Sequence, residues 1–255
     1  MKTTIVTAYF KLHQSKANHS KYLEWMQNML IIDSPMVIFC DELSMPIISS
    51  LREKSAEKTK IIVTKFQEFH SYKYMSTFIN DYNTKDHERY HNPLLYMIWN
   101  EKSHFLKRAI DLNVFSSEYF LWVDIGCFRR PNTEFLNWPN PDKIDLMPKD
   151  KIILLSVMPF TAEEYNCNSL QNLPDFKLCP GRIGGTMFGG TAETVLKWHD
   201  LYYEMLEYFI SIDRFIGKDQ NIMSSIAVLH KDIVGLIYPQ QKCNDIWFYF
   251  HEFLQ

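Results

Sequence analysis

Short apolar runs alternate with longer amphipathic runs along most of this chain, and this alternation restricts its fold more than any other feature. The apolar, β-branched runs predict strands at residues 3–9, 36–40, 60–64, 118–124 and 151–158, with a last strand in IVGLIYP. The amphipathic runs predict helices at residues 19–31, 93–112, 191–212 and 219–229. Strands that alternate with helices in this way are typical of an α/β fold with a mixed, mostly parallel central sheet flanked by helices.

Two segments add to this pattern without dividing the chain. A polar, aromatic-rich segment follows Phe66, and with the helix after it we expect a helical insertion around residues 66–112. The aromatic end of the chain predicts a C-terminal tail at residues 239–255. We therefore expect one domain over residues 1–255.

Proline and glycine mark three further segments. DELSMPIISSLREK predicts a short helix that is interrupted near Pro46. Residues 131–150 are rich in Pro and Asn and predict a loop. GRIGGTMFGG predicts a short strand between glycine turns.

The composition argues against several classes of protein. The chain is 46% hydrophobic with a net charge of −3, so we expect a globular protein without a nucleic-acid partner. The five cysteines form no CxxC pair, which favours reduced thiols in a cytosol-like compartment. The first segment turns polar after ten residues, and no apolar run reaches the ~18–20 residues of a membrane span. We expect a soluble protein without a membrane partner.

Asp124 ends the apolar run of FLWVDIGCFRR, where an unpaired carboxylate would be costly to bury. The carboxyl ends of parallel strands share one edge of a sheet, so Asp124 and residues 7–9 of the first strand are expected to meet there. A strand-end carboxylate is a good ligand for a divalent cation beside a diphosphate, and Gly126 would let a ligand approach the backbone. The alternative is a surface turn in which Asp124 pairs with Arg129 or Arg130.

Several well-known motifs are missing from the sequence. It contains no GxxxxGK[ST], no GxGxxG after the first strand, no GxSxG and no HExxH. Gly126 stands where an aspartyl-phosphate phosphatase would want a second Asp. These absences argue against P-loop proteins, ordinary dinucleotide-binding proteins and phosphatases of that type.

Five stretches carry a resemblance to a known family: TIVTAYF, PMVIFCDE, NEKSHFLKRAI, EYFLWVDIGCFR and IGGTMFGG. From residue 3 to about residue 230 the chain resembles the HtrL/YibB-like family, which is assigned to the GT-A-type glycosyltransferases. The WVDIGCFR segment is the most specific part of this likeness. The resemblance implies a GT-A-like, Rossmann-related fold and a metal-dependent transferase that uses a UDP-sugar, with Mn²⁺ or another divalent cation as cofactor.

The resemblance also suggests a donor and an acceptor. Members of the group include giant-virus enzymes, and the likeness extends to enzymes of that kind that glucosylate collagen. It implies glucose from UDP-glucose as the donor sugar, and galactosylhydroxylysine of a collagen-like polypeptide as the hydroxyl acceptor, with retention of configuration. A viral source would place the protein in the host cytoplasm or the virion. The residues themselves decide neither the sugar, nor the acceptor, nor inversion against retention.

The metal ligands are the next implication of the resemblance. GT-A enzymes hold Mn²⁺ and the sugar nucleotide with a DxD-type motif at the end of a central strand, and the matching stretch here is Asp124-Ile125-Gly126, which lacks the second carboxylate. Asp124 is expected to bind the metal, or to contact the ribose while another residue takes the metal. These enzymes often recruit a His near the C-terminus, and His251 in FYFHEF is the candidate, with an ordinary packing or surface His as the alternative.

The remaining site residues follow from the same resemblance. The expected donor-binding residues are Thr7, Ala8, Tyr9, Phe10, Arg52, Lys102, Asp124, Ile125, Gly126, Gly184 and Gly185. The expected catalytic residues are Asp219 and Gln220 in GKDQN. Asp219 would be the general base of an inverting enzyme, or lie by the reacting carbon in a retaining one. The alternatives are core aromatics, solvated helix charges, tight glycine turns and an acid favoured by a helix dipole.

Two other functions stay open at this point. A nucleotidyltransferase would share the sheet and the metal, but KLHQSKANHS lacks the glycine expected in its basic loop. A non-catalytic carbohydrate- or protein-binding module would present a platform of surface aromatics, namely Trp138, Trp247, Phe248 and Tyr249. The apolar end WFYFHEFLQ also favours a homodimer, because such a surface is a liability if it is exposed.

Overall fold

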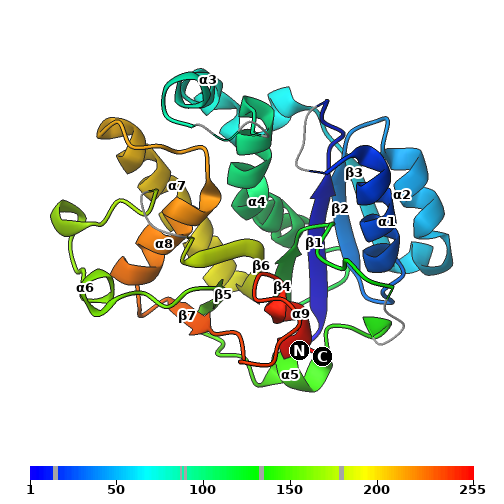
Figure 1. Cartoon of the computed structure of the whole chain (residues 1–255). Coiled ribbons are helices and arrows are strands. Elements are labelled where there is room, and N and C mark those ends of the chain that lie inside the picture. The colour runs from blue at the N-terminus through cyan, green and yellow to red at the C-terminus, as the bar shows by residue number, and fades with distance from the viewer. Residues whose placement is uncertain (14–16, 87, 89–90, 132–134, 178–180) are drawn as a thin grey trace.

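A seven-stranded sheet runs through the molecule, with strand order β3-β2-β1-β4-β6-β5-β7 (Figure 1). The structure is a computed structural model that describes residues 1–13, 17–86, 88, 91–131, 135–177 and 181–255. The strands are β1 (Thr3–Tyr9), β2 (Met36–Cys40), β3 (Thr59–Val63), β4 (Tyr119–Val123), β5 (Ile152–Ser156), β6 (Ile183–Thr191) and β7 (Val234–Ile237).

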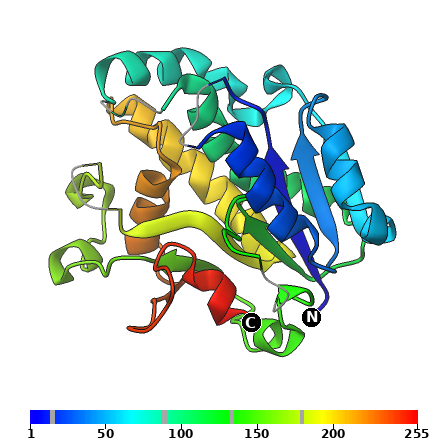
Figure 2. The same cartoon turned by 45° about the vertical axis from the view of Figure 1, so that its right-hand side comes forward.

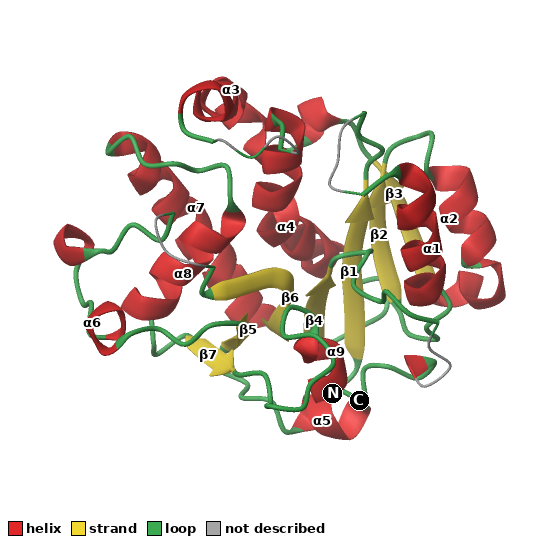
Figure 3. Ribbon diagram, viewed as in Figure 1, coloured by secondary structure: helices red, strands yellow, loops and turns green. Residues whose placement is uncertain are grey.

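Helices cover both faces of this sheet (Figure 3). The α-helices are α1 (His19–Leu30), α2 (Met45–Leu51), α3 (Met75–Thr84), α4 (Pro93–Leu112), α5 (Pro141–Asp145), α6 (Ala162–Tyr165), α7 (Ala192–Ser211), α8 (Asp219–Leu229) and α9 (Tyr249–Phe253). The 3₁₀ helices are η1 (Glu53–Lys58), η2 (Phe66–Glu68), η3 (His70–Tyr74) and η5 (Leu170–Asn172). Among the described residues, none of the helices combines the length and the apolar character that crossing a membrane requires.

The sheet separates two apolar cores, and strand β2 shows how. Val37 and Phe39 point into the core beneath α4, α7 and α8, whereas Ile38 points into the core beneath α1. Alternate side chains of a strand face opposite sides of a sheet, so a strand that is apolar throughout must be covered on both faces. Figure 2 shows the two helical layers on either side of the strands. The predicted α/β fold with a mixed, mostly parallel sheet is confirmed.

The direction of β6 decides which residues meet at the edge of the sheet. β1, β2, β3 and β4 are parallel to one another, and β6 pairs antiparallel with β4. The beginning of β6 therefore lies beside the end of β4, where the amide of Asp124 donates to the carbonyl of Thr186 at 2.8 Å. The beginning of β6, from late in the chain, thus lies at the edge of the sheet where β1 and β4 end.

The glycine-rich stretch differs from its prediction. It was expected to hold a short strand between glycine turns, but Ile183–Thr191 is one continuous strand of nine residues. The glycines give neighbours room: a Cβ atom on Gly189 would lie 2.5 Å from the carbonyl oxygen of Phe120, and one on Gly190 would lie 2.4 Å from Thr194 Oγ1. Glycine density here reflects close packing of a central strand, which local turn signals cannot reveal.

Two smaller predictions also need correction. α2 is not interrupted near Pro46; it begins at Met45, and Pro46 occupies its first turn, where the missing N–H is not needed. The stretch 131–150, predicted as a loop, contains the short helix α5, which Asn140 caps by accepting from the amide of Asp142. The predicted helices 93–112 and 219–229 are confirmed as α4 and α8.

The C-terminal segment packs on its own domain. Phe250 and Leu254 are completely buried in the core beneath α1, and the indole of Trp138 donates to the carbonyl of His251 at 2.9 Å. The apolar tail therefore supplies no argument for a second subunit. Of the aromatic platform expected of a binding module, Trp138, Phe248 and Tyr249 are buried, and Trp247 is exposed.

Candidate active site

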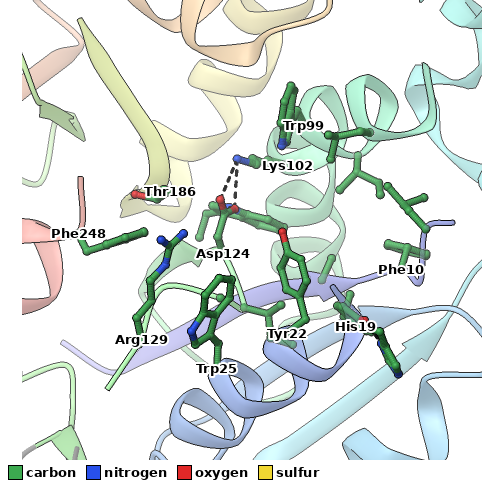
Figure 4. A pocket seen from close by; sticks show the side chains of 18 residues that line it. Phe10, His19, Tyr22, Trp25, Trp99, Lys102, Asp124, Arg129, Thr186 and Phe248 are labelled. Carbon is green, nitrogen blue, oxygen red and sulfur yellow. Dashed lines mark hydrogen bonds and ion pairs between the residues drawn. The ribbon is translucent and has the colours of Figure 1, made fainter. Parts of the chain in front are cut away.

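A cavity opens at the edge of the sheet where β1 and β4 end (Figure 4). Its walls come from the end of β1, α1, α4, the loop after β4, the beginning of β6 and the C-terminal segment. Parallel strands deliver their carboxyl ends to one edge, which is where open α/β sheets bind ligands. The cavity accordingly brings Asp124 together with Ala8, Tyr9 and Phe10.

A buried ion network lies against this cavity. Lys102, on α4, is 4% exposed, and its ammonium donates to the carbonyl of Gly185 at 2.7 Å. The same nitrogen lies 3.1 Å from Asp124 Oδ1 and 2.9 Å from Asp219 Oδ2. The indole nitrogen of Trp122 donates to Asp124 Oδ1 at 2.7 Å. Lys102 thereby ties the end of β4 and the start of α8 to β6, and Asp124 pairs with this lysine rather than with Arg129 or Arg130.

Electrostatics keep the lysine charged. Burial by itself would lower the pKa of Lys102, but the carboxylates of Asp124 and Asp219 outweigh burial and raise that pKa above its ordinary value. One ammonium between two carboxylates leaves one negative charge in excess. The Asp219 side chain is 6% exposed and that of Asp124 is 32% exposed. Asp124 is therefore the acid that presents this charge to the cavity.

Gly185 allows the network to close. A Cβ atom at this position would lie 2.7 Å from Asp219 Oδ2, nearer than side-chain carbons approach other atoms in proteins. Any larger residue would push Asp219 away from β6 and from Lys102. The glycine is thus needed for the approach of α8 to the strand, and its carbonyl serves the same lysine.

Arg129, in the loop after β4, is held between two aromatic rings of the cavity wall (Figure 4). Its guanidinium carbon lies 4.4 Å from the ring centre of Trp25 and 4.4 Å from that of Phe248. Within the described part of the chain the guanidinium makes no hydrogen bond or ion pair. Stacking on rings restrains a guanidinium while its N–H groups remain available, so Arg129 is prepared to bind an anion.

Aromatic side chains form most of the remaining wall. Tyr22 and Trp25 stand three residues apart on α1 with ring centres 5.4 Å apart, and both line the cavity. The hydroxyl of Tyr9 shares a hydrogen bond with Nδ1 of His19. Burial raises the pKa of Tyr9 to about 12, so its ring stays a neutral phenol. Flat, amphipathic surfaces of this kind suit a planar base or a sugar ring.

The predicted donor-binding, catalytic and metal-binding residues divide into three groups. Those that line the cavity are Ala8, Tyr9, Phe10, Lys102, Asp124, Ile125 and Gly126. Gly185 and Asp219 reach it through Lys102. Thr7, Gly184, Gln220, Arg52 and His251 are outside its lining.

Arg52 was expected to contact phosphate or the donor sugar, and the structure places it elsewhere. It is 1% exposed, and its guanidinium donates to Thr59 Oγ1 at 2.8 Å and to the carbonyl of Leu30 at 2.9 Å. A further contact reaches the carbonyl of Ser34 at 3.0 Å. Arg52 donates to backbone carbonyls at the end of α1 and just beyond it, which is a structural role.

His251 and Asp124, the two predicted metal ligands, do not share a cavity. His251 lines an adjoining hollow beneath the C-terminal segment, which shares Arg129 and Phe248 with the cavity. Its ring stacks there on Phe128, with centres 5.3 Å apart, and its centre lies 5.2 Å from that of Phe135. Burial lowers the pKa of this imidazole. The histidine that the resemblance suggested as a metal ligand is therefore packed against aromatic rings in this structure.

Thr7, Gly184 and Gln220 also serve the fold around the site. Thr7 is fully buried within β1. A Cβ atom on Gly184 would lie 3.1 Å from Val157, on the side of the sheet away from Asp219. The Gln220 side chain donates to the carbonyl of Ile183 at 2.9 Å, which fastens α8 to the start of β6.

The sequence reasoning missed several residues of the wall. Tyr22, Trp25, Trp99, Trp122 and Thr186 line the cavity. The spacing of Tyr22 and Trp25 was a usable signal, because residues three apart share a helix face. Which aromatic residues face a cavity rather than a core depends on contacts made after folding.

A second group of possible metal ligands lies beside the cavity. Asp86, Glu88 and His91 offer ligand atoms within 4.8 Å of one another. The His91 ring packs edge-on against Trp99, with centres 5.0 Å apart, and Trp99 lines the cavity. Asp86 already accepts hydrogen bonds from Tyr96 and pairs with His91 Nδ1 at 2.6 Å. The group is thus largely satisfied by its own contacts.

Three comparisons bear on identity. A family model described as "Bacterial protein of unknown function (HtrL_YibB)" matches residues 1–238. The chain is 22% identical to Protein HtrL of Escherichia coli (strain K12) over 268 residues, which covers 92% of this chain and 87% of HtrL. The apo crystal structure of mouse xyloside xylosyltransferase 1 matches with a TM-score of 0.52 and 13% identity, over 98% of this chain and 90% of the mouse chain. The last likeness concerns the fold, which is GT-A-like.

Proposed function

We propose that this chain, which belongs to the HtrL/YibB family and has a GT-A-like fold, is a glycosyltransferase that moves a sugar from a UDP-sugar to a hydroxyl acceptor. The observation that carries the proposal is the buried network of Lys102, Asp124 and Asp219 beside an aromatic-lined cavity. An acid that presents an excess negative charge at the cavity can hold the cation that offsets the charge developing on a leaving diphosphate.

The nucleotide half of the donor would occupy the aromatic wall. The end of β1 supplies Ala8, Tyr9 and Phe10, and α1 supplies Tyr22 and Trp25. Backbone groups at the strand end would hydrogen-bond the uracil, and the neutral ring of Tyr9 or Tyr22 would stack on it.

The diphosphate would lie toward Arg129. Its stacked guanidinium makes no hydrogen bond or ion pair with the described residues, so it offers the bidentate geometry that phosphate oxygens accept. Lys102 has a different part. Its ammonium already contacts the carbonyl of Gly185 and the carboxylates of Asp124 and Asp219. Lys102 therefore holds Asp124 in place and offsets part of the negative charge of that carboxylate.

A divalent cation, Mn²⁺ in the narrower form of the proposal, fits Asp124. Divalent cations of the Mg²⁺ type are commonly held by one or two carboxylates together with substrate phosphates and water. Asp124 supplies one partly exposed carboxylate at the cavity, which meets the minimum. The bound cation would offset the charge of the departing diphosphate. His251 is not part of this set, because it lines another hollow.

Asp219 acts in this proposal as a positioning residue. Its carboxylate is buried, touches Lys102 at 2.9 Å and does not line the cavity. Gln220 follows it and anchors the start of α8 to the carbonyl of Ile183. Both residues would hold the floor of the donor site, rather than take a proton from the acceptor.

Glucose as the sugar, and galactosylhydroxylysine of a collagen-like polypeptide as the acceptor, form the narrowest version of the proposal. Their support is the likeness of the five sequence stretches and nothing in the cavity itself. Homodimer formation likewise has no support from the buried tail.

The experiment is hydrolysis of a panel of UDP-sugars by the full chain, with UDP release measured in Mn²⁺ and in EDTA. We expect one sugar to release UDP, and release to fall in EDTA. UDP with Mn²⁺ should raise the melting temperature more than UDP alone, since ligands that bind the native state stabilise it by mass action. Asp124→Asn should remove the metal-dependent part, whereas Asp142→Asn, an exposed acid on α5, should not.

Two results would overturn the proposal. One is the absence of UDP release from every sugar together with no thermal shift from UDP. The other is release of pyrophosphate from a nucleoside triphosphate and a sugar phosphate, which would identify a nucleotidyltransferase.

A further inference from the structure

Three histidines gather where α4, α7 and η3 pack together, and none of them lines the donor cavity. His104 lies on α4, His199 on α7, and His70 begins η3. Ring centres are 4.8 Å apart for His70 and His104, 5.5 Å for His104 and His199, and 5.9 Å for His70 and His199. His199 is 8% exposed and the other two are half-buried. The proposed transferase reaction uses none of them.

Two of the ring nitrogens face each other at the spacing of metal ligands. His104 Nδ1 and His199 Nε2 are 3.2 Å apart. Two imidazole nitrogens bound to one tetrahedral zinc ion, at 2.0–2.1 Å each, lie about 3.4 Å apart. The contact is also compatible with an imidazole–imidazole hydrogen bond, so the test has to separate the two.

The other nitrogen of His199 already has the partner that metal-bound histidines use. His199 Nδ1 lies 3.0 Å from Asp200 Oδ1. A carboxylate on Nδ1 favours the tautomer with the proton on that nitrogen, which leaves the lone pair on Nε2. Nε2 is the atom that faces His104. The carboxylate thus orients the ring and makes the facing nitrogen a better ligand.

His70 is placed to complete the group. Its ring stacks on that of His104 and packs edge-on against Tyr203 at 4.4 Å. Its amide donates to Glu101 Oε1 at 2.8 Å, which fixes the backbone while the half-buried side chain can still rotate. A rotation about its side-chain bonds is required before a ring nitrogen joins the other two.

The charges around the group permit a cation. Two of the cations that face the group are paired, Lys73 with Glu207 and Lys107 with Asp111.

The remaining charged groups around the histidines are accounted for in the same way. The Arg108 guanidinium lies over the Phe39 ring at 4.9 Å. Glu101 is fully buried and accepts from the amide and the hydroxyl of Ser71. The exposed carboxylate of Asp200 adds a negative charge beside His199.

We propose that His104 and His199, joined by His70 after it rotates, form a site for one borderline transition-metal ion, with Zn²⁺ as the preferred occupant. Imidazole ligands suit Zn²⁺, Ni²⁺ and Co²⁺, whereas Mn²⁺ and Mg²⁺ prefer oxygen. This nitrogen-ligand site is thus chemically distinct from the oxygen-ligand site proposed at Asp124. It ties α4, η3 and α7 together on the helical layer that carries Lys102.

The experiment is titration of the untagged, EDTA-treated full chain with Zn²⁺ by calorimetry, and with Co²⁺ by visible absorption. We expect one Zn²⁺ per chain near pH 7. His104→Gln and His199→Gln should each weaken binding by more than tenfold, and Asp200→Asn by about 10- to 100-fold. His230→Gln, at the end of α8, and Asp86→Asn should bind like the wild type.

Two further measurements keep the proposal open to refutation. Histidine-ring NMR of the wild type should show Zn²⁺ shifting the signals of His70, His104 and His199, whatever the variants do to folding. Melting curves in EDTA report whether each variant is folded. The three rings would be shown to be only packed together if the wild type bound no Zn²⁺, or if His104→Gln and His199→Gln bound Zn²⁺ as tightly as the wild type. Loss of binding in Asp86→Asn would place the metal at the other group.

Discussion

Lys102 illustrates how one residue can be both the most buried charge of a site and the reason the site holds its shape. Its ammonium has three acceptors, one backbone and two carboxylate, and these come from β4, β6 and α8. A buried pair is strongly destabilised when one partner is removed, because the other charge stays buried without compensation. The residue that organises the site is therefore also one that stability depends on.

Lys102→Met should lower the free energy of unfolding by about 3–5 kcal/mol, because Asp124 and Asp219 would be left unpaired. The measurement is urea denaturation near neutral pH. Lys107→Met on the same helix is the matched control, since Lys107 makes an exposed pair with Asp111 and should cost about 0–1 kcal/mol. Equal losses in the two variants would mean that the network contributes no more than a surface pair.

Arg129→Met should weaken UDP binding by about 10- to 100-fold with little loss of stability, since charge-assisted hydrogen bonds to an anion contribute about 1.5–3 kcal/mol. Calorimetric titration with UDP measures this. Arg130→Met is the control, because Arg130 is exposed and does not line the donor cavity. Unchanged affinity in Arg129→Met would place the diphosphate elsewhere.

At the scale of elements, β6 shows how a strand can be shaped by its neighbours. Its glycines do not form turns. The lack of a Cβ atom lets the Phe120 carbonyl approach Gly189, the Thr194 hydroxyl approach Gly190 and the Asp219 carboxylate approach Gly185. α8 approaches through Gly185, and its first residue then reaches Lys102. The strand and the helix build the site together.

Gly185→Ala should reduce transfer at least tenfold, and lower the free energy of unfolding by about 1–3 kcal/mol, because the new methyl group displaces Asp219. UDP release and denaturation are measured on the same preparation. Gly184→Ala is the neighbouring control, where the methyl group meets the side chain of Val157 at 3.1 Å and that side chain can yield. The idea fails if the two variants retain equal activity.

Glu101, where α4 packs against η3, is expected to titrate near neutral pH. Burial raises the pKa of Glu101 to about 7, against which the hydrogen bonds from Ser71 and His70 act only in part. A carboxyl whose folded pKa is above its unfolded value contributes stability that is present at low pH, and is lost as pH rises through the folded pKa.

Wild-type stability should therefore decline between about pH 5 and pH 8 relative to Glu101→Gln, in which that slope should be absent. Denaturation midpoints across this range are the measurement. Asp111→Asn, at the exposed end of the same helix, should keep the wild-type slope. A parallel pH profile for Glu101→Gln would contradict the assignment.

At the scale of the whole molecule, the C-terminal segment connects the apolar core beneath α1 with the proposed donor cavity. Phe250 is completely buried beneath α1, while Phe248 in the same segment holds one face of Arg129. Thr186 of β6 donates to the carbonyl of Trp247 at 2.9 Å, which closes this connection across the cavity. Stability of the tail and binding of the donor should consequently be coupled.

Phe250→Ala should cost about 3–5 kcal/mol of unfolding free energy and also weaken UDP binding, because the segment that positions Phe248 loses its anchor. Denaturation and calorimetry measure the two effects. Phe253→Ala, at a half-buried position of α9, should produce smaller changes in both. A large loss of stability without any change in UDP affinity would show that tail and site are independent.

The sequence by itself determined the features that depend on residues close together in the chain. The periodicity of apolar side chains placed α4 and α8 at their observed bounds, and the end of an apolar strand placed Asp124 at the carboxyl edge of the sheet. These properties follow from backbone geometry, in which each residue's face is set by its neighbours along the helix or strand.

Only the tertiary structure decided which side chains share a partner. Arg52 and Lys102 are both buried cations, yet one caps the end of α1 and the other joins Asp124 at the cavity to the buried Asp219. His251 became a packed ring and Arg129 a stacked one. Such differences arise from contacts between segments distant in the chain, and no local pattern carries them, because the cost of burying a charge depends on what surrounds it after folding.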